Sequence, residues 1–232
     1  MCDLVFYTCF FGSDNNWANL IPKCPSNIYP CYYYTNNLNT FARLEGTNWK
    51  GILLDVPIHY DNVQSAMDAK HLKACPHEYK ELNSHKYICY FDSKHNVDEK
   101  KIEFLIQNQM EIPDGFDVLI PKHPCNFTCI WEEYDMAMGV EKYNAEKEKN
   151  KVYIEKQLEN LSENVKHHLT TQFILRKNTE ICKTMNDTWY KHIQECGIMC
   201  QLSFFFIQQI YKDIIFAIEY GECYCYNYCV PL

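Results

Sequence analysis

The chain has 232 residues, of which 47% are hydrophobic and 22% are charged, proportions typical of a folded globular protein and not of a disordered one. Its net charge of −8 argues against a nucleic-acid-binding surface, because phosphate contacts require clustered Lys and Arg side chains. No internal repeat, low-complexity linker or Gly/Ser-rich hinge divides the chain, so we expect a single domain over residues 1–232.

Three short apolar segments near the N-terminus predict buried strands, and they are Leu4–Phe11, Cys31–Tyr34 and Gly51–Val56. Residues Asn62–Ala74 lack helix breakers and carry apolar residues at helical spacing, so they predict a helix. Pro76 should end this helix, because proline disfavours helical geometry in the residue before it.

The segment Tyr87–Phe91 has the aromatic and β-branched composition of a buried central strand. It is followed directly by Asp92, and open α/β sheets bind ligands at the carboxyl ends of their strands. Asp92 is therefore a candidate ligand-binding residue. The alternative is that it only caps the following turn, which Asp does well.

The second half alternates predicted helices and strands, which indicates an α/β fold with one mainly parallel sheet. Its last segment, Leu202–Tyr220, is strongly apolar but is interrupted by charged and Gln residues, so we expect a buried helix that stops at Gly221 and not a membrane span. The other predicted elements are helices over Asp98–Met110, Glu132–Tyr143, part of Glu141–His168, and Asp187–Glu195, and strands over Asp117–Ile120 and Gln172–Leu175.

The N-terminus carries no basic leader and no small-residue cleavage site, so we expect a cytoplasmic protein without a transmembrane segment. In a reducing compartment, the 14 cysteines are expected to be free thiols or metal ligands. The spaced pairs Cys125/Cys129, Cys196/Cys200 and Cys225/Cys229, with Cys223, leave a structural zinc site as an alternative, although none has the C-x₂-C spacing of a zinc knuckle.

Seven short blocks follow one another between Val5 and Tyr211: Tyr7–Gly12, Cys31–Asn36, Ala69–His77, Tyr87–Lys94, His123-Pro124 with Trp131–Glu133, Ile174–Arg176, and Cys200–Phe204. In this order they resemble a glycosyltransferase-like family of unknown function that includes plant mucilage-related and turgor-defect proteins. The resemblance implies a GT-A-like α/β fold, a mainly parallel nucleotide-sugar-binding sheet flanked by helices. It also implies transfer of a sugar from a nucleotide-sugar donor to an unknown acceptor.

The resemblance assigns roles to matching positions of this chain. It implies that Asp92 binds a divalent cation, Mn or Mg, and that Glu132, Glu133 and Gln201 are catalytic, with His123 nearby. Because adjacent helical residues do not share a face, at most one of the two glutamates should point into a cleft. The implied donor-binding residues are Thr8, Phe11, Gly12, Asn36, Lys70, Lys73, His77, Lys94 and Arg176.

Several positions depart from the family pattern. Asn36 replaces an Asp, Lys70 replaces an Arg, and Met199-Cys200 replaces Arg-Asp. Lys94, two residues after Asp92, would repel a metal ion but could pair with a diphosphate, so we expect weaker metal dependence than in relatives with two acidic positions. Two alternatives remain open: a catalytically degraded relative that binds nucleotide, glycan or protein, and a cysteine-rich, zinc-stabilised interaction protein.

Overall fold

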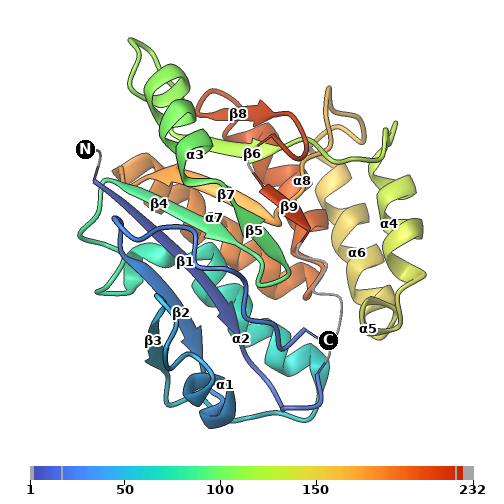
Figure 1. The fold of residues 1–232 in the computed structure, drawn as a ribbon. Coiled ribbons are helices and arrows are strands. Elements are labelled where there is room, and N and C mark those ends of the chain that lie inside the picture. The colour runs from blue at the N-terminus through green and yellow to red at the C-terminus, as the bar shows by residue number, and fades with distance from the viewer. Residues whose placement is uncertain (1–2, 17, 223, 227–232) are drawn as a thin grey trace.

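The computed structural model describes residues 3–16, 18–222 and 224–226, apart from the side chains of residues 62, 225 and 226. Within these residues, seven strands form one sheet in the order β3-β2-β1-β4-β7-β6-β8 (Figure 1). Four of its six strand pairings are parallel, and the two made by β7 are antiparallel. The prediction of an α/β fold with a mainly parallel sheet is confirmed.

Strands β1, β2 and β4 run in the same direction, so the residues that follow them emerge at one edge of the sheet. A second sheet pairs the short strands β5 and β9. The strands are Leu4–Phe10 (β1), Cys31–Thr35 (β2), Lys50–Leu53 (β3), Tyr87–Phe91 (β4), His95–Val97 (β5), Val118–Pro121 (β6), Phe173–Lys177 (β7), Ile215–Ile218 (β8) and Tyr224–Tyr226 (β9).

The described helices are Leu38–Ala42 (α1), Asn62–Ala74 (α2), Glu99–Leu105 (α3), Ile130–Met138 (α4), Glu141–Asn144 (α5), Lys147–Leu158 (α6), Glu180–Cys196 (α7) and Cys200–Ile210 (α8), with a short 3-10 helix at Pro76–Glu78 (η1) and a π-helical turn at Ile106–Met110 (η2). Helix α2 spans the residues expected from the sequence. The Asp61 side chain caps it by accepting a hydrogen bond from the backbone N–H of Val63 at 2.7 Å.

The two faces of the sheet are covered by different helices. Alternate residues of β1 point to opposite faces, so Tyr7 belongs to the core beneath α2, α7 and α8, and Phe6 to the core beneath α3 and η2. A third apolar cluster joins α4, α6 and α8 beside the sheet. Among the described residues, no helix has both the length and the apolar character needed to cross a bilayer.

The prediction of one long helix over Leu202–Tyr220 is wrong in its second half. Helix α8 ends at Ile210, and Ile215–Ile218 form β8, which pairs in parallel with Val118–Pro121. The β-branched and aromatic residues of this segment suit an edge strand, and pairing with β6 satisfies their backbone hydrogen bonds. The helix expected over Glu132–Tyr143 is also divided, since α4 ends before Gly139 and α5 begins at Glu141.

Candidate functional site

Asp92 is the first residue after β4, at the sheet edge where β1 and β2 also end. Its Oδ1 accepts a hydrogen bond from the Tyr90 hydroxyl at 2.7 Å and another from Lys73 Nζ at 3.1 Å. Its Oδ2 lies 3.9 Å from Lys94 Nζ. The Asp92 side chain is 26% exposed and that of Lys73 only 3%, so the carboxylate forms the accessible end of a largely buried ion pair.

Four lysines from three segments interact electrostatically with this carboxylate, and we call them the lysine cluster: Lys70 and Lys73 of α2, Lys94 after β4, and Lys142 of α5. Burial would raise the pKa of Asp92, but the charges of Lys73, Lys94 and Lys70 outweigh it and hold that pKa well below its usual range. Burial, reinforced by the charges of Lys70 and Lys94, lowers the pKa of Lys142 to about 8. The lysine cluster therefore gathers positive charge around Asp92 at this edge of the sheet, an arrangement that suits an anion.

Cys200, the first residue of α8, belongs to the same electrostatic network. Burial alone would raise the pKa of its thiol, but the charges of Lys70 and Lys73 lower it, as does the Thr171 hydroxyl at 3.4 Å from the sulfur. The thiol in turn raises the pKa of Lys70 against the effect of burial. Cys200 thus interacts electrostatically with the lysine cluster, at the position where the family resemblance led us to expect an acid.

The loops that follow β1, β2 and β3 are joined by Asn36. Its Oδ1 accepts a hydrogen bond from the backbone N–H of Gly12 at 3.0 Å, and its Nδ2 donates to the Pro57 carbonyl at 2.9 Å. Gly12 has a φ of +134°, a conformation that side-chain-bearing residues rarely adopt. Asn36 therefore shapes the sheet edge around the candidate site, and its amide is already engaged within the chain.

Two of the expected donor-binding residues lie in the interior. Thr8 is fully buried in the middle of β1, and Phe11 is 5% exposed and packs into the core under α2. Neither side chain is presented at the surface of the site, because β1 is covered on both faces and Phe11, which follows it, packs into the core.

Arg176 lies in β7 and is 1% exposed. Its guanidinium donates to the carbonyl of Lys73 at 2.6 Å, to that of Ala74 at 2.9 Å, and to Asn186 Oδ1 at 2.8 Å. These are the last carbonyls of α2, which have no partners inside the helix. The structure therefore places Arg176 behind Lys73 as a helix cap, away from the surface where a phosphate would bind.

His77 is also turned away from the lysine cluster. Its Nε2 lies 3.1 Å from Asp187 Oδ1 on α7, and its Nδ1 lies 3.4 Å from Asn186 Nδ2. Of the three basic donor-binding residues expected in this segment, Lys73 contacts Asp92 and Lys70 interacts with it electrostatically. His77 pairs elsewhere, because α2 ends at Ala74 and η1 changes the direction of the chain.

Glu133 and Gln201 are brought into direct contact beside the lysine cluster. Glu133 is 1% exposed, accepts a hydrogen bond from Gln201 Nε2 at 2.5 Å, and lies 2.6 Å from His168 Nδ1. Gln201 Oε1 accepts from the backbone N–H of Thr171 at 3.4 Å, and the Thr171 hydroxyl contacts Cys200. A continuous hydrogen-bonded network thus connects Glu133 to the thiol in the lysine cluster.

Glu132 faces the opposite way and is exposed. Its carboxylate accepts from the backbone N–H of Thr128 at 2.6 Å and from the Thr128 hydroxyl at 3.0 Å, next to the N-terminus of α4. This agrees with the expectation that only one of the two glutamates points inward. His123 donates its backbone N–H to the His168 carbonyl at 2.7 Å, and its ring packs on Phe127.

Three residues of the site were not anticipated as site residues: Tyr90, Lys142 and His168. Tyr90 could have been found, because residues two apart on a strand share a face and Tyr90 precedes Asp92 by two. Lys142 belongs to a charged segment whose composition is typical of a solvated surface. His168 lies in a connection without periodicity, so no local signal marks it.

The donor set around Asp92 does not fit a divalent cation. Mn²⁺ and Mg²⁺ prefer several oxygen ligands. Here both oxygens of Asp92 already face ammonium groups, Lys73 at Oδ1 and Lys94 at Oδ2. Among the described residues, the groups of side chains with metal-binding geometry do not include Asp92.

The ten cysteines whose side chains are described are free thiols. None of Cys125, Cys129, Cys196 and Cys200 belongs to a described group with metal-binding geometry. Cys223 and Cys229 lie outside the described residues, as does the side chain of Cys225.

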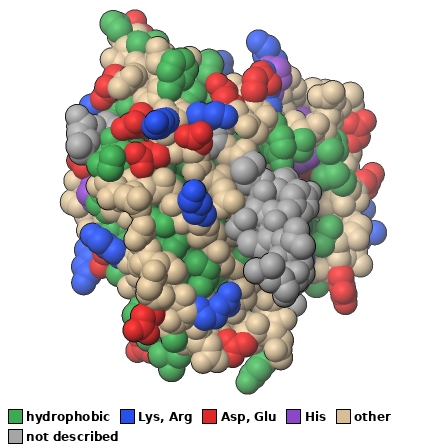
Figure 2. All heavy atoms as spheres, viewed as in Figure 1, with side chains coloured by type: hydrophobic (Ala, Val, Ile, Leu, Met, Phe, Trp, Pro, Cys, Tyr) green, Lys and Arg blue, Asp and Glu red, His purple; other side chains and the backbone are tan. Residues whose placement is uncertain are grey.

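Figure 2 shows one face of the molecule. On this face, the acidic and basic side chains of the described residues are interspersed and form no continuous basic patch.

Scans against models of known protein families and against curated proteins find no match. The solved structures that are similar to this chain include two glycosyltransferases. The apo form of mouse xyloside xylosyltransferase 1 aligns with a TM-score of 0.52 at 9% identity, covering 92% of this chain and 84% of the other. Core-mannan synthase A from Aspergillus fumigatus, in a Mn/GDP form, aligns with a TM-score of 0.53 at 11% identity, covering 98% and 75%. The chain therefore has the GT-A-like fold of glycosyltransferases.

Proposed function

We propose that this protein is a glycosyltransferase that moves a sugar from a nucleotide-sugar donor to an acceptor, and that the lysine cluster binds the donor's diphosphate. The observation that carries the proposal is the convergence of Lys70, Lys73, Lys94 and Lys142 at the carboxyl ends of β1, β2 and β4. Open α/β sheets bind ligands at this edge. The two similar structures, both glycosyltransferases, support the proposal through their fold.

The chemistry follows from the charge of the leaving group. When the bond between the anomeric carbon and the diphosphate breaks, negative charge develops on the phosphate oxygen, and ammonium groups held in place stabilise it. Lys73 is only 3% exposed, so it contributes its charge from within the ion pair with Asp92, which the Tyr90 hydroxyl also holds. In this proposal the lysines neutralise the leaving group without a metal ion.

Glu133 and Gln201 hold neighbouring residues of the site in place. Glu133 is enclosed, so it holds Gln201 and His168 by hydrogen bonds and does not meet an acceptor directly. Gln201 and Cys200 are adjacent on α8, so the network fixes the start of this helix against the lysine cluster. Because the seven sequence blocks follow one another in the family's order, we propose that the chain is related to the mucilage-related family. We also propose that it acts in the cytoplasm.

The alternative function is a donor-binding protein without transferase activity. It is favoured by one observation, that the described residues around the lysine cluster offer a thiol, Cys200, where an acid was expected. A thiol does not replace a carboxylate in binding sugar hydroxyls. Both functions require a bound nucleotide, so they differ in turnover and not in binding.

The test is a panel of nucleoside diphosphates and nucleotide sugars, screened by thermal shift and then assayed for donor hydrolysis and transfer. We expect at least one donor to raise the melting temperature and to be hydrolysed. The variants Lys94→Ala and Lys142→Ala should raise the Kd of that donor's nucleoside diphosphate about tenfold each, equivalent to losing one charged hydrogen bond. Lys147→Ala, an exposed lysine of α6, is the matched control. Donor binding without turnover would favour the alternative, and no binding by any nucleotide would overturn both.

A further inference from the structure

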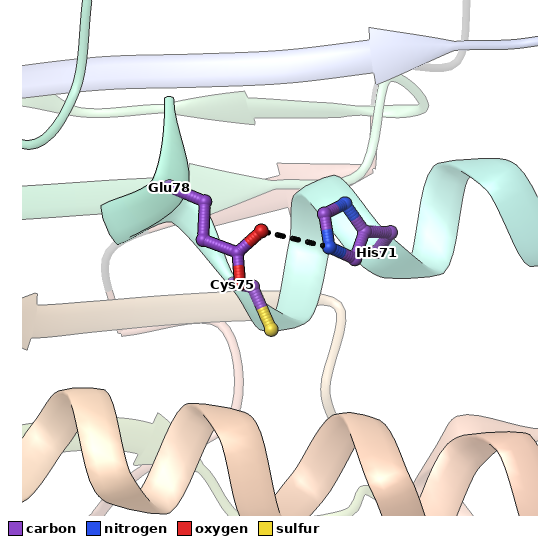
Figure 3. A group of neighbouring side chains, drawn as sticks. All are labelled: His71, Cys75 and Glu78. Atoms are coloured by element: carbon purple, nitrogen blue, oxygen red, sulfur yellow. Dashed lines mark ion pairs between the residues drawn. The ribbon is translucent and has the colours of Figure 1, made fainter. Parts of the chain in front are cut away.

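A second group of side chains lies where α2 ends and η1 begins. A ring nitrogen of His71, Cys75 Sγ and a Glu78 carboxylate oxygen lie within 4.8 Å of one another, and Figure 3 shows the three side chains side by side. His71 and Cys75 share a helix face, because the backbone N–H of Cys75 donates to the His71 carbonyl at 2.8 Å. His71 Nε2 and Glu78 Oε2 are 3.1 Å apart. Ligands of a tetrahedral zinc ion are separated by about 3.3–3.8 Å, given bonds of ~2.0–2.3 Å.

The surroundings of His71 favour metal binding through its Nε2. Its other nitrogen, Nδ1, lies 2.9 Å from the Tyr79 hydroxyl, which can accept the ring N–H and leave Nε2 as a ligand. The ring is also held edge-on against Tyr190 of α7, with centroids 4.7 Å apart. Histidine ligands of metals are commonly oriented by such a second hydrogen bond.

We propose that His71, Cys75 and Glu78 bind one Zn²⁺ ion, with water in the fourth position. The donor set of nitrogen, sulfur and oxygen suits zinc, whereas Mg²⁺ and Mn²⁺ prefer oxygen ligands. Binding converts the Cys75 thiol to a thiolate and releases its proton to solvent. The carboxylate of Asp187, 4.0 Å from the sulfur, adds negative charge beside the ion.

The site is accessible from solvent. The side chains of His71 and Glu78 are 32% and 51% exposed, while Cys75 is 1% exposed and forms the floor. Two of the three proposed ligands therefore face solvent, and the third is enclosed.

The ion would connect two elements of the fold, α2 and η1, next to α7. Cys75 and Glu78 lie on either side of Pro76, so zinc would fasten the end of α2 to η1, with α7 alongside through Tyr190 and Asp187. Helix α2 also carries Lys70 and Lys73. The inference does not rest on the proposed transferase activity, because it concerns the stability of this joint.

The test uses the full chain after dialysis against a chelator, titrated with Zn²⁺ and with Co²⁺ as a spectroscopic probe. We expect one tightly bound ion per chain, and a rise in melting temperature on the order of 5–10 °C at a hundredfold excess of free zinc over its Kd. Bound Co²⁺ should show a thiolate charge-transfer band in the near ultraviolet, which Cys75→Ser abolishes. Glu78→Gln, at a half-exposed position that does not disturb the core, should raise the Kd for zinc at least tenfold.

The control is the double variant Cys125→Ser/Cys129→Ser, which removes two thiols outside the described metal-binding groups and should keep the band. Loss of the band in this control, its persistence in Cys75→Ser, or an unchanged Kd in Glu78→Gln would each overturn the assignment. A melting temperature that does not change when zinc is added would also overturn the assignment.

Discussion

Lys73 and Asp92 form an ion pair of 3.1 Å in which the lysine is almost completely enclosed and the carboxylate remains partly exposed. The lysine also lies 4.9 Å from the centre of the Tyr90 ring, and the Tyr90 hydroxyl donates to the same carboxylate oxygen. Burial lowers the pKa of Lys73, against the charge of Asp92, which raises it. The charge of Asp92 therefore offsets part of the cost of burying this ammonium group at the edge of the site.

Removing this carboxylate should destabilise the fold. In Asp92→Asn, Lys73 remains buried without its counter-charge, so we expect the free energy of unfolding to fall by about 2–4 kcal/mol in chemical denaturation. The double variant Lys73→Met/Asp92→Asn should be less destabilised than the sum of the two single variants, by at least about 1 kcal/mol. Additive effects would show that the pair is not coupled.

The ion pair between Lys73 and Asp92 predicts that the free energy of unfolding falls in acid. Because the pKa of Asp92 is lowered in the folded chain, the stability it contributes is present above the unfolded pKa of about 3.9 and is lost as pH falls below it. The difference in unfolding free energy between the native chain and Asp92→Asn should therefore shrink below about pH 4. A difference that stays constant from pH 6 to pH 3 would contradict this assignment.

Nucleoside diphosphate binding should weaken at alkaline pH. Lys142, with a pKa of about 8, loses its charge as pH rises through that value, so the lysine cluster attracts an anion less strongly. If the bound form keeps Lys142 protonated, the Kd should rise about tenfold between pH 7 and pH 9, measured by calorimetry. In Lys142→Ala the Kd should be raised already at pH 7 and should change little over this interval. A pH dependence that persists in Lys142→Ala would assign the titration to another group.

Divalent cations should have little effect on nucleotide affinity. Since the lysine cluster neutralises the phosphates in our proposal, the Kd of a nucleoside diphosphate should change by less than about threefold when Mn²⁺ or Mg²⁺ is added, a difference below about 0.7 kcal/mol. A gain of a hundredfold would instead indicate that Asp92 binds a metal ion when the nucleotide is present.

The adjacent glutamates provide a matched pair of variants. Glu133→Gln replaces a carboxyl group that accepts from Gln201 and lies against His168 by an amide, whose NH₂ group must face one of these two partners, so we expect a loss of about 2–3 kcal/mol of stability. Glu132→Gln changes an exposed helix-terminal carboxylate and should have a much smaller effect. The comparison is made by thermal and chemical denaturation. Equal effects of the two substitutions would argue against the inward position of Glu133.

Arg176 should act on the site through helix α2. In Arg176→Lys the planar group that donates to both terminal carbonyls of α2 is lost, so we expect about 3 kcal/mol lower stability and weaker nucleoside diphosphate binding, because Lys73 is no longer held. Arg43→Lys, at the chain's other arginine, is the control and should leave nucleotide affinity unchanged. If Arg176→Lys leaves nucleotide affinity unchanged, the hydrogen bonds of Arg176 to the end of α2 do not influence nucleotide binding.

Much of the fold could be predicted because it depends on local patterns. The apolar segments at Leu4–Phe10 and Tyr87–Phe91 are strands, and Asn62–Ala74 is a helix with Asp61 as its cap. These elements are buried on both faces or have breakers at their ends, so composition and spacing identify them. The order of such elements was sufficient to predict a mainly parallel α/β sheet.

The segment after α8 is predicted incorrectly because its pattern is ambiguous. Residues Ile215–Ile218 are apolar and follow a helix without a proline or glycine between, so the local sequence allows the helix to continue. Pairing with Val118–Pro121, almost 100 residues earlier, makes them a strand. An interaction over that separation leaves no mark in the local sequence.

Burial and alternation are local properties, so they specify the elements of the sheet and the position of Asp92 at the end of a central strand. The folded chain determines what faces Asp92. It gathered lysines from α2, α5 and the segment after β4 into one cluster, and turned Arg176, His77 and Glu132 to other contacts. The charge at this site is the sum of the charges on segments that meet only in the folded chain. The spacing of residues along one helix does not show which face of that helix meets the other segments.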